Sequence, residues 1–422
     1  MIEIIEKSKC CGCSACVQKC PRKCITMIED EEGFSYPKVN QSDCIDCGLC
    51  ETVCPIQNKV EKRVPIIAVA AYNKNEDIRR VSSSGGIFTL LAETIIKKEG
   101  VVFGARFNEK WEVILDYSET MNGIGAFRGS KYVQASVGSA FQQCEQFLKQ
   151  GKPVLFTGTP CQIAGLKLYL GKEYVNLLTV DVVCHGVPSP MVWRKYILEL
   201  LKEHNTAYRA VGGKSTVLPS LDLISSIKDI KFRDKSDGWK KFSFVLDFAE
   251  VTADGKQSSV MSSIKVPCDD SLFMNAFISD LIIRPSCFKC PFRGVENRQS
   301  DLSIADFWGV EKLIPQMDDD KGTSLVMVNT LKGDDVFGNL DVISCKADVL
   351  AASQWSAGLM EELAYNKRRD RFFGKMKHSR SIVEQMKIHT LPETEYKKVT
   401  TPIWKKIARR VKKLVKGIIK CV

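Results

Sequence analysis

Two short cysteine-rich runs constrain the fold of this chain more than any other feature. CCGCSACVQKCP spans residues 10–21, and CIDCGLCETVCP repeats its spacing over residues 44–55. Both runs follow the pattern C-x2-C-x2-C-x3-C-P. The sequence has 18 cysteines but no n-region and apolar h-region at Met1, so it gives no sign of export. Metal ligation or redox chemistry therefore explains these thiols better than disulfides do.

The spacing indicates two 4Fe-4S clusters. Three thiolates at these intervals can wrap one loop around three corners of an iron-sulfur cube, while Gly12 and Gly48 allow the tight turns. The proline after the fourth cysteine turns the chain away, so that this cysteine ligates the other cluster. We assign one cluster to Cys10, Cys13, Cys16 and Cys54, and the other to Cys44, Cys47, Cys50 and Cys20.

Zinc is the alternative, but paired zinc motifs usually leave about 12 to 20 residues between pairs and lack runs of four cysteines closed by proline.

The segment between the two runs, from Ile25 to Val39, predicts a small hairpin, as in a ferredoxin-like fold of two similar halves. Cys11 and Cys24 fall outside the register, and we interpret each as a small buried thiol.

The chain after the charged segment at residues 58–65 alternates between expected strands and helices. Strands are predicted within residues 66–72, 101–107, 153–158 and 176–186, with helices within 82–100, 137–152, 159–171 and 188–204. From Ile227 the pattern changes to strands, which predicts a β-rich lobe. The fold class is therefore α+β: a ferredoxin-like domain (1–58), a mixed α/β domain with a β-rich lobe (66–390), and a tail (396–422).

Four more cysteines lie where the chain is expected to bend. Cys161 is at a strand-to-helix turn, Cys184 is at a strand end, and Cys287 and Cys290 form another C-x2-C closed by proline. Scattered cysteines are more often small buried side chains than metal ligands. From spacing alone, a third cluster is therefore a weaker interpretation than four buried thiols.

Several long motifs resemble one known family. SSSGG, RGSKYVQ, FTGTPCQIAGLK, DVVCHGVPSP, IKFRDKSDGW, CFKCPF and SDLSIADFWG are similar to segments of the coenzyme F-420 hydrogenase/dehydrogenase beta-subunit family, over residues 10–309. That family includes bacterial members found among polysaccharide-biosynthesis genes. The resemblance implies a flavoprotein with FAD and a third 4Fe-4S cluster at Cys161, Cys184, Cys287 and Cys290. One departure is Ala305, where the family usually has glycine, and we expect its methyl group to disturb a tight turn.

The flavin-binding residues are argued partly from physics. Glycines ahead of a helix expose N–H groups to a pyrophosphate, and the helix dipole favours its negative charge. The expected contacts are Ser82, Ser83, Ser84, Gly85 and Gly86 in one turn, Thr157, Gly158 and Thr159 in a second, and Arg128 and Lys131 as charge partners. The alternative is that these turns cap ordinary helices and that the two cations are solvated.

These features predict an iron-sulfur flavoprotein oxidoreductase that takes electrons from a ferredoxin-like donor and reduces a small-molecule acceptor. Catalytic residues are not identified; His185 could donate a proton, but we expect it to bond a backbone carbonyl. One alternative is a subunit that relays electrons to a partner redox enzyme and has no substrate of its own. Another is an accessory protein of glycan synthesis whose clusters are structural.

The tail is the source of the chain's basicity. From Lys405 onward it holds eight bases, and without them the formal net charge falls from +11 to +3. Apolar residues from Trp404 to Ile419 recur at helical spacing, which predicts a basic amphipathic helix on an anionic membrane surface. A helix docked on the protein is the alternative, and nucleic acid is not expected as a partner. The expected location is the cytoplasm, with this contact at the inner face of the membrane.

Overall fold

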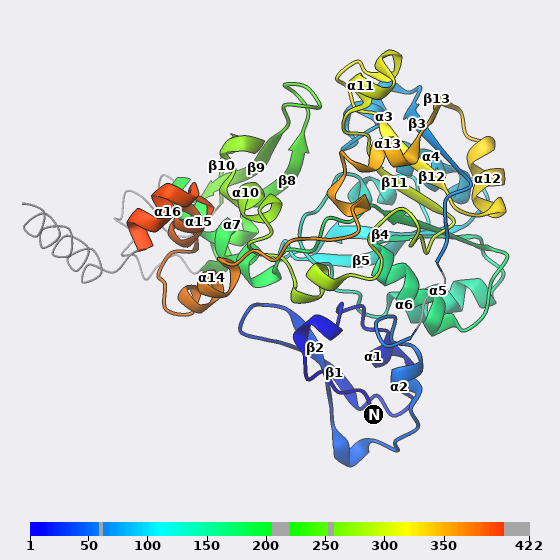
Figure 1. Cartoon of the computed structure of the whole chain (residues 1–422), viewed down its shortest axis with the longest axis horizontal. Helices are drawn as coiled ribbons and strands as arrows, with labels where there is room; N and C mark the ends of the chain where they lie inside the picture. The colour runs from blue at the N-terminus through cyan, green and yellow to red at the C-terminus, as the bar shows by residue number, and fades with distance from the viewer. Residues whose placement is uncertain (59–61, 205–219, 252–256, 401–422) are drawn as a thin grey trace, which may run out of the picture.

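The structure is a computed structural model that describes residues 1–58, 62–204, 220–251 and 257–400. Three parts are visible in Figure 1: an N-terminal module in dark blue, a large sheet covered by helices, and a smaller lobe that carries the last described helices. Among the described residues, no helix has the length and apolar character needed to cross a bilayer. The predicted amphipathic tail lies outside the described residues beyond Thr400.

The N-terminal module consists of a hairpin and short helices. Its elements are η1 (Lys7–Lys9), α1 (Ala15–Lys19), β1 (Ile25–Glu29), β2 (Ser35–Val39), η2 (Gln41–Asp43) and α2 (Leu49–Thr52). β1 and β2 pair antiparallel, with Ile25 opposite Val39. The turn is held by Asp30, whose Oδ1 accepts backbone N–H bonds from Glu32 and Phe34 at 3.0 Å. The hairpin predicted between the two cysteine runs is therefore confirmed.

An eight-stranded sheet forms the centre of the molecule. Its strands are β3 (Ile67–Asn73), β4 (Val101–Phe107), β5 (Val113–Ser118), β6 (Val154–Gly158), β7 (Leu177–Val182), β11 (Leu302–Asp306), β12 (Ser324–Val328) and β13 (Val342–Ala347). They lie in the order β13-β3-β12-β11-β7-β6-β4-β5. β4, β6, β7 and β11 are parallel, and β3 runs with them because two antiparallel pairings separate it from β11. The carboxyl ends of these five strands therefore share one edge, where open α/β sheets bind ligands.

Helices cover both faces of the sheet. They are α3 (Glu76–Arg80), α4 (Ile87–Ile96), α5 (Ala140–Lys149), α6 (Pro160–Leu170), α11 (Val310–Leu313), α12 (Leu331–Gly338) and α13 (Val349–Ser353). Side chains of a strand alternate between faces, so Val101 and Phe103 of β4 pack with α5 and α6, whereas Val102 packs with α4. Short helices η3 (Gly123–Phe127), η4 (Cys268–Asp270), η5 (Pro285–Lys289), η6 (Pro315–Met317) and η7 (Ala357–Leu359) lie in the connections.

The N-terminal module packs on α5 and α6. Its Cys13, Ala15 and Val53 belong to the same apolar core as these two helices. Gly165 of α6 permits the close approach, because a Cβ there would lie only 3.1 Å from Cys13 Sγ. One cysteine run is thereby held against the sheet domain.

The lobe is a three-stranded antiparallel sheet wrapped by helices. Its elements are α7 (Pro190–His204), α9 (Ser220–Ser225), β8 (Ile227–Asp234), β9 (Ser243–Val251), β10 (Gln257–Pro267), α10 (Leu272–Ile278), α14 (Arg369–Met376), α15 (Ile382–Thr390) and α16 (Glu393–Thr400). Buried aromatic side chains of Trp193, Phe232, Phe244 and Phe273 form its centre. The strands expected from Ile227 onward are confirmed, whereas no local pattern indicated that α14 and α15 cover them.

Candidate functional site

Two cavities in the N-terminal module are lined by the cysteines of the two runs. One cavity has Cys20, Cys44, Cys47 and Cys50 on its wall. The other has Cys10, Cys13, Cys16 and Cys54. Both are partly open to solvent. Each cavity thus takes three cysteines from one run and the fourth from the other. We call them the outer cavity and the inner cavity, respectively.

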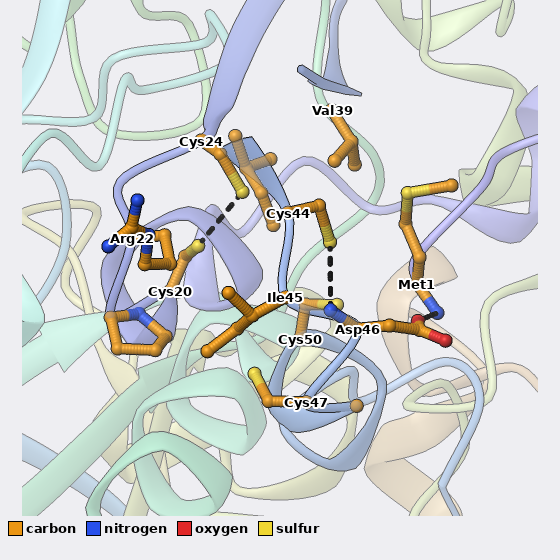
Figure 2. A pocket seen from close by; sticks show the side chains of 13 residues that line it. Met1, Cys20, Arg22, Cys24, Val39, Cys44, Ile45, Asp46, Cys47 and Cys50 are labelled. Carbon is orange, nitrogen blue, oxygen red and sulfur yellow. Dashed lines mark hydrogen bonds and ion pairs between the residues drawn. The ribbon is translucent and has the colours of Figure 1, made fainter. Parts of the chain in front are cut away.

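The backbone around these cavities presents N–H groups to sulfur. Asp46 N–H lies 3.4 Å from Cys44 Sγ, as Figure 2 shows for the outer cavity, and Ile2 N–H lies 3.3 Å from Cys50 Sγ. Such bonds are a feature of iron-sulfur sites. Among the described residues, no three Cys, His, Asp or Glu side chains converge tightly enough for a single metal ion. A cubane needs a wider arrangement, because each of its thiolates binds a different iron.

Cys24 is a small buried thiol, as expected, and it also lines the outer cavity, with its Sγ 3.4 Å from Cys20 Sγ. The same interpretation needs correction for Cys11. Cys11 is only half-buried and lines the inner cavity, and its thiol lies close enough to that of Cys161, at the start of α6, for the two to shift each other's pKa. The spacing motif could not indicate this contact, because it joins residues of two different domains.

A third set of cysteines gathers at the carboxyl edge of the sheet. It consists of Cys161 in α6, Cys184 after β7, Cys287 in η5, and Cys290 directly after η5. Burial raises the pKa of Cys287 to about 12 and that of Cys290 to about 11, with the neighbouring thiols contributing. The Cys11 thiol, followed by burial, raises the pKa of Cys161 well above its usual range. A metal centre would supply the positive charge that stabilises the thiolate form of these four cysteines.

Three buried arginines surround this third set. Arg284, Arg293 and Arg298 are at most 3% exposed. Nε of Arg293, and Nε and Nη1 of Arg298, have no hydrogen-bond partner within the part of the chain that the structure describes. Asp181 is the one carboxylate paired there with Arg298, at 3.8 Å. Buried charges need counter-charges, and a cube bound by four thiolates is a net anion. The third set therefore fits a 4Fe-4S cluster.

The predicted phosphate-binding turn Ser82–Gly86 lies immediately before α4. It meets the RGSK segment, because Ser83 Oγ accepts a hydrogen bond from Ser130 N–H at 2.7 Å. Arg128 Nε donates to Thr89 Oγ1 of α4 at 3.1 Å. The structure thus brings together two of the segments that the sequence proposed for one cofactor.

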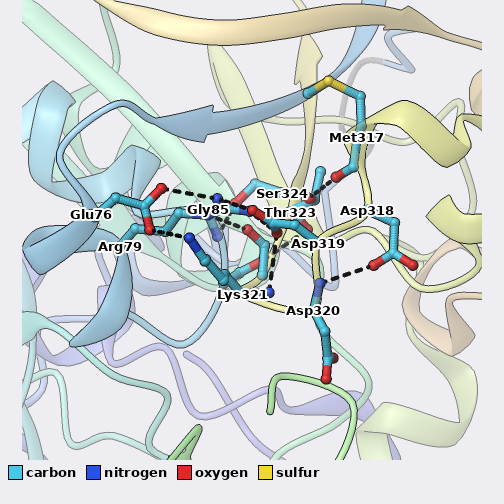
Figure 3. A network of polar contacts seen from close by, with 12 residues as sticks. Glu76, Arg79, Gly85, Met317, Asp318, Asp319, Asp320, Lys321, Thr323 and Ser324 are labelled. Atoms are coloured by element: carbon cyan, nitrogen blue, oxygen red, sulfur yellow. Dashed lines mark hydrogen bonds and ion pairs between the residues drawn. The ribbon is translucent and has the colours of Figure 1, made fainter.

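A network of polar contacts fixes this turn. Figure 3 shows Arg79 of α3 bonded through both terminal nitrogens to Asp319, at 2.7 and 2.6 Å. Gly85 N–H donates to Ser324 Oγ at 3.0 Å, and Ser84 Oγ donates to the Thr323 carbonyl at 2.9 Å. The turn is therefore preorganised by the loop that leads into β12.

Two lysines at this turn lack a carboxylate partner among the described residues. Lys131 Nζ, on a half-buried side chain, donates to the carbonyl of Arg128 at 2.8 Å, and desolvation lowers its pKa to about 7. Lys235 Nζ donates to the Ser84 carbonyl at 3.1 Å, and desolvation lowers its pKa to about 8. Desolvated ammonium groups beside a helix N-terminus suit a phosphate-bearing ligand. Lys235 was missed, although it lies in the IKFRDKSDGW motif.

The second predicted turn, Thr157–Thr159, lies at the start of α6, next to Cys161 of the third cysteine set. Thr157 Oγ1 donates to the Phe103 carbonyl at 2.7 Å, and Thr159 caps α6 with its Oγ1 3.2 Å from Cys161 Sγ. Within the described residues, no hydrogen bond joins it to Ser82–Gly86. Its place in the pyrophosphate site therefore stays a prediction.

Two other expectations also need correction. His185 Nε2 bonds the carboxylate of Asp280 at 2.7 Å rather than a backbone carbonyl. Ala305 lies within β11, opposite Leu325, so its methyl group disturbs no turn. The turn of that motif comes later, at Gly309, whose φ is +81°.

Comparison with known proteins agrees with this architecture. Residues 9–58 match the family described as 4Fe-4S dicluster domain. Residues 151–342 match the family described as the C terminus of the coenzyme F420 hydrogenase/dehydrogenase beta subunit. Residues 151–342 therefore carry a domain of this beta-subunit family. Its N-terminal module is an iron-sulfur domain of the ferredoxin type.

Individual relatives match only part of this chain. The F subunit of the F(420)H(2) dehydrogenase of Methanosarcina mazei is 26% identical over 214 residues, which cover 47% of this chain and 60% of that protein. The VorC subunit of the ketoisovalerate oxidoreductase of Methanothermobacter marburgensis is 32% identical over 63 residues, covering 14% of this chain and 80% of that protein. A chain of the F420-reducing [NiFe] hydrogenase complex from Methanosarcina barkeri aligns with 15% identity and a TM-score of 0.43, covering 75% of this chain and 94% of that one.

Proposed function

We propose that this chain is an iron-sulfur flavoprotein subunit that carries electrons between an external redox protein and FAD, where a small-molecule acceptor is reduced. The packing of the inner cavity on the start of α6 carries the proposal: Cys13 Sγ lies against Gly165, and the Cys11 and Cys161 thiols are close enough to shift each other's pKa. It brings the inner cavity of the N-terminal module into contact with the third cysteine set. Both sets of candidate ligands therefore belong to one path rather than to two separate sites.

The geometry supports an order along this path. Cys47 on the wall of the outer cavity is exposed, so this cavity can face a ferredoxin-like donor. The inner cavity lies on the side of the module that packs on α6 through Cys13. The third set follows at the carboxyl edge of the sheet. We infer the order outer cluster, inner cluster, third cluster and FAD.

The turn Ser82–Gly86, with Arg128, Lys131 and Lys235, is the part of the chain that we propose for the FAD pyrophosphate. Bound FAD would supply the exchange between single electrons and electron pairs. The chain's own residues would orient and neutralise it: Gly85 and Gly86 open the backbone ahead of α4, and the two lysines provide desolvated positive charge.

The second candidate is a relay subunit that passes electrons to a partner enzyme and binds no substrate. The relative from Methanosarcina mazei, by name one subunit of a dehydrogenase, favours this alternative. The two candidates differ in whether the isolated chain, loaded with its cofactors, reduces a small molecule at all.

Anaerobic reconstitution with iron, sulfide and FAD tests the proposal. We expect about twelve irons, from three cubanes, and one FAD per chain, with the flavin reduced when reduced ferredoxin is added. Cys161→Ser should abolish or strongly slow flavin reduction while the N-terminal clusters keep their spectra. Cys345→Ser, on the edge strand β13, is the matched control and should behave as wild type. Ferredoxin-driven flavin reduction at an unchanged rate in Cys161→Ser would refute the path.

A further inference from the structure

Arg284 connects the inner cavity to the third cysteine set. Its backbone belongs to the loop of the third set, since its carbonyl accepts the N–H of Cys287 at 3.0 Å. Its side chain extends into the N-terminal module, where Nε donates to the Cys10 carbonyl at 2.7 Å and Nη2 lies 3.5 Å from Cys10 Sγ. Arg284 thus belongs to the loop that carries Cys287 of the third set, and its side chain contacts Cys10, a proposed ligand of the inner cluster.

The position of this guanidinium is determined by several contacts. Nη1 donates to Gln134 Oε1 at 3.0 Å, and Nη2 donates to the Ser35 carbonyl at 3.0 Å. Its cation lies 4.3 Å from the ring centre of Tyr36. The side chain is fully buried, so solvent screens its charge little. Its donors are directed by geometry that a lysine could not reproduce in full.

The charge of Arg284 has no carboxylate partner among the described residues: its contacts are two carbonyls, an amide, a thiol and aromatic rings. Arg369, also buried, differs in this respect. It donates to the Ile283 carbonyl, next to Arg284, but its charge is neutralised by both oxygens of Glu32 at 3.1 and 2.6 Å. The inner cavity and the third set therefore face one uncompensated buried cation.

We propose that Arg284 is a positioning residue shared by the inner and third clusters, and that its charge raises the reduction potentials of both relative to the outer cluster. This rests on the proposed function. Adding an electron makes a cluster more negative, so a nearby fixed cation stabilises the reduced form. The hydrogen bond from Cys287 N–H to the Arg284 carbonyl keeps this residue next to the third set as well as to Cys10. Electrons entering at the outer cluster are thereby drawn inward.

Redox titration monitored by electron paramagnetic resonance tests this on the reconstituted full chain. In Arg284→Met, the reduction potentials of the inner and third clusters should fall by at least about 59 mV relative to that of the outer cluster. For a one-electron step this is a tenfold change in the equilibrium constant for electron exchange between the clusters. Arg284→Lys retains the charge and should restore most of the shift. Gln134→Glu leaves Arg284 in place but adds a compensating charge, so it should lower both potentials even if Arg284→Met binds its clusters poorly.

The double variant Glu32→Gln with Arg369→Met is the matched control. It loosens the same contact between the module and the third-set loop without changing the net charge there. The inference is wrong if this control shifts the potentials as Arg284→Met does, if all three clusters shift together, or if Gln134→Glu and Arg284→Met leave them unchanged. Iron content separates this failure from that of the proposed function: eight irons in the wild type would overturn the latter.

Discussion

The two glycines of the cysteine runs provide a matched test of the contact between the N-terminal module and the sheet domain. Gly12 directly precedes the second motif cysteine of its run and Gly48 directly follows that of the other run, and both are left-handed, with φ of +74° and +71°. A Cβ on Gly12 would lie 2.5 Å from Gln134 Nε2 and 3.0 Å from Arg284 Nη1, whereas a Cβ on Gly48 would meet nothing within 4 Å. Alanine therefore imposes the same backbone strain at both positions but a steric clash at only one.

The magnitudes follow from these distances. A left-handed alanine costs about 1–2 kcal/mol at either position. Overpacking adds about 1–3 kcal/mol to Gly12→Ala, because Gln134 and Arg284 must move and their hydrogen bonds to each other and to Cys11 and Cys10 weaken. Gly12→Ala should therefore be about 1–3 kcal/mol less stable than Gly48→Ala.

Anaerobic urea titration of the two loaded variants, followed by loss of cluster absorbance, measures this difference. We also expect Gly12→Ala, but not Gly48→Ala, to slow electron transfer into the flavin. Equal urea midpoints for the two variants would refute the idea that the Cys10 loop is packed against Gln134 and Arg284. A larger loss for Gly48→Ala would have the same consequence.

Three further changes test other parts of the molecule. Cys290→Ser should lower iron from about twelve to about eight per chain and leave the N-terminal clusters intact; full iron content would contradict the third site. Lys131 has a folded pKa of about 7, below its unfolded value of about 10.4, so the unfolded state binds more protons between these values. Stability of the flavin-free protein should rise with pH over that window, by at most about 1.4 kcal/mol per pH unit, and more steeply than in Lys131→Met when unfolding is measured in urea; equal slopes would exclude a desolvated ammonium. Truncation after Thr401 should keep clusters and flavin but leave the protein in the supernatant when it is spun with anionic vesicles at low salt, whereas the full chain, with about 1 kcal/mol from each tail base, should pellet; two soluble forms would argue for a docking helix.

Local patterns in the sequence predicted much of the fold. The strands β3, β4, β6 and β7 and the helices between them follow apolar runs and amphipathic periods that each lie within a few residues. The antiparallel strands β12 and β13 and the helices α14 and α15 of the lobe escaped prediction. Their partners lie far away in the chain, as when β12 pairs with β3, and no local pattern encodes such pairing.

The same division applies to the candidate site. Fixed spacing led directly to the eight cysteines that line the two N-terminal cavities. Cys11 looked like a small core thiol because its neighbour, Cys161, is 150 positions away. Arg284 and Lys235 likewise act across long separations, and a single cation carries no spacing signal. The sequence alone therefore could not predict that Cys11, Arg284 and Lys235 lie between neighbouring sites.

The long reach of Arg284 has a consequence for biosynthesis. Domains generally fold in the order in which they leave the ribosome, so the N-terminal module can close its hairpin while most of the sheet domain is still untranslated. Until residue 284 emerges, the Cys10 carbonyl lacks its arginine donor and the loop lacks its cover. Every residue that lines the inner cavity belongs to the module, so all of its candidate ligands are present at that stage. The N-terminal module can therefore bind its clusters before Cys287 and Cys290 of the third set have been synthesised.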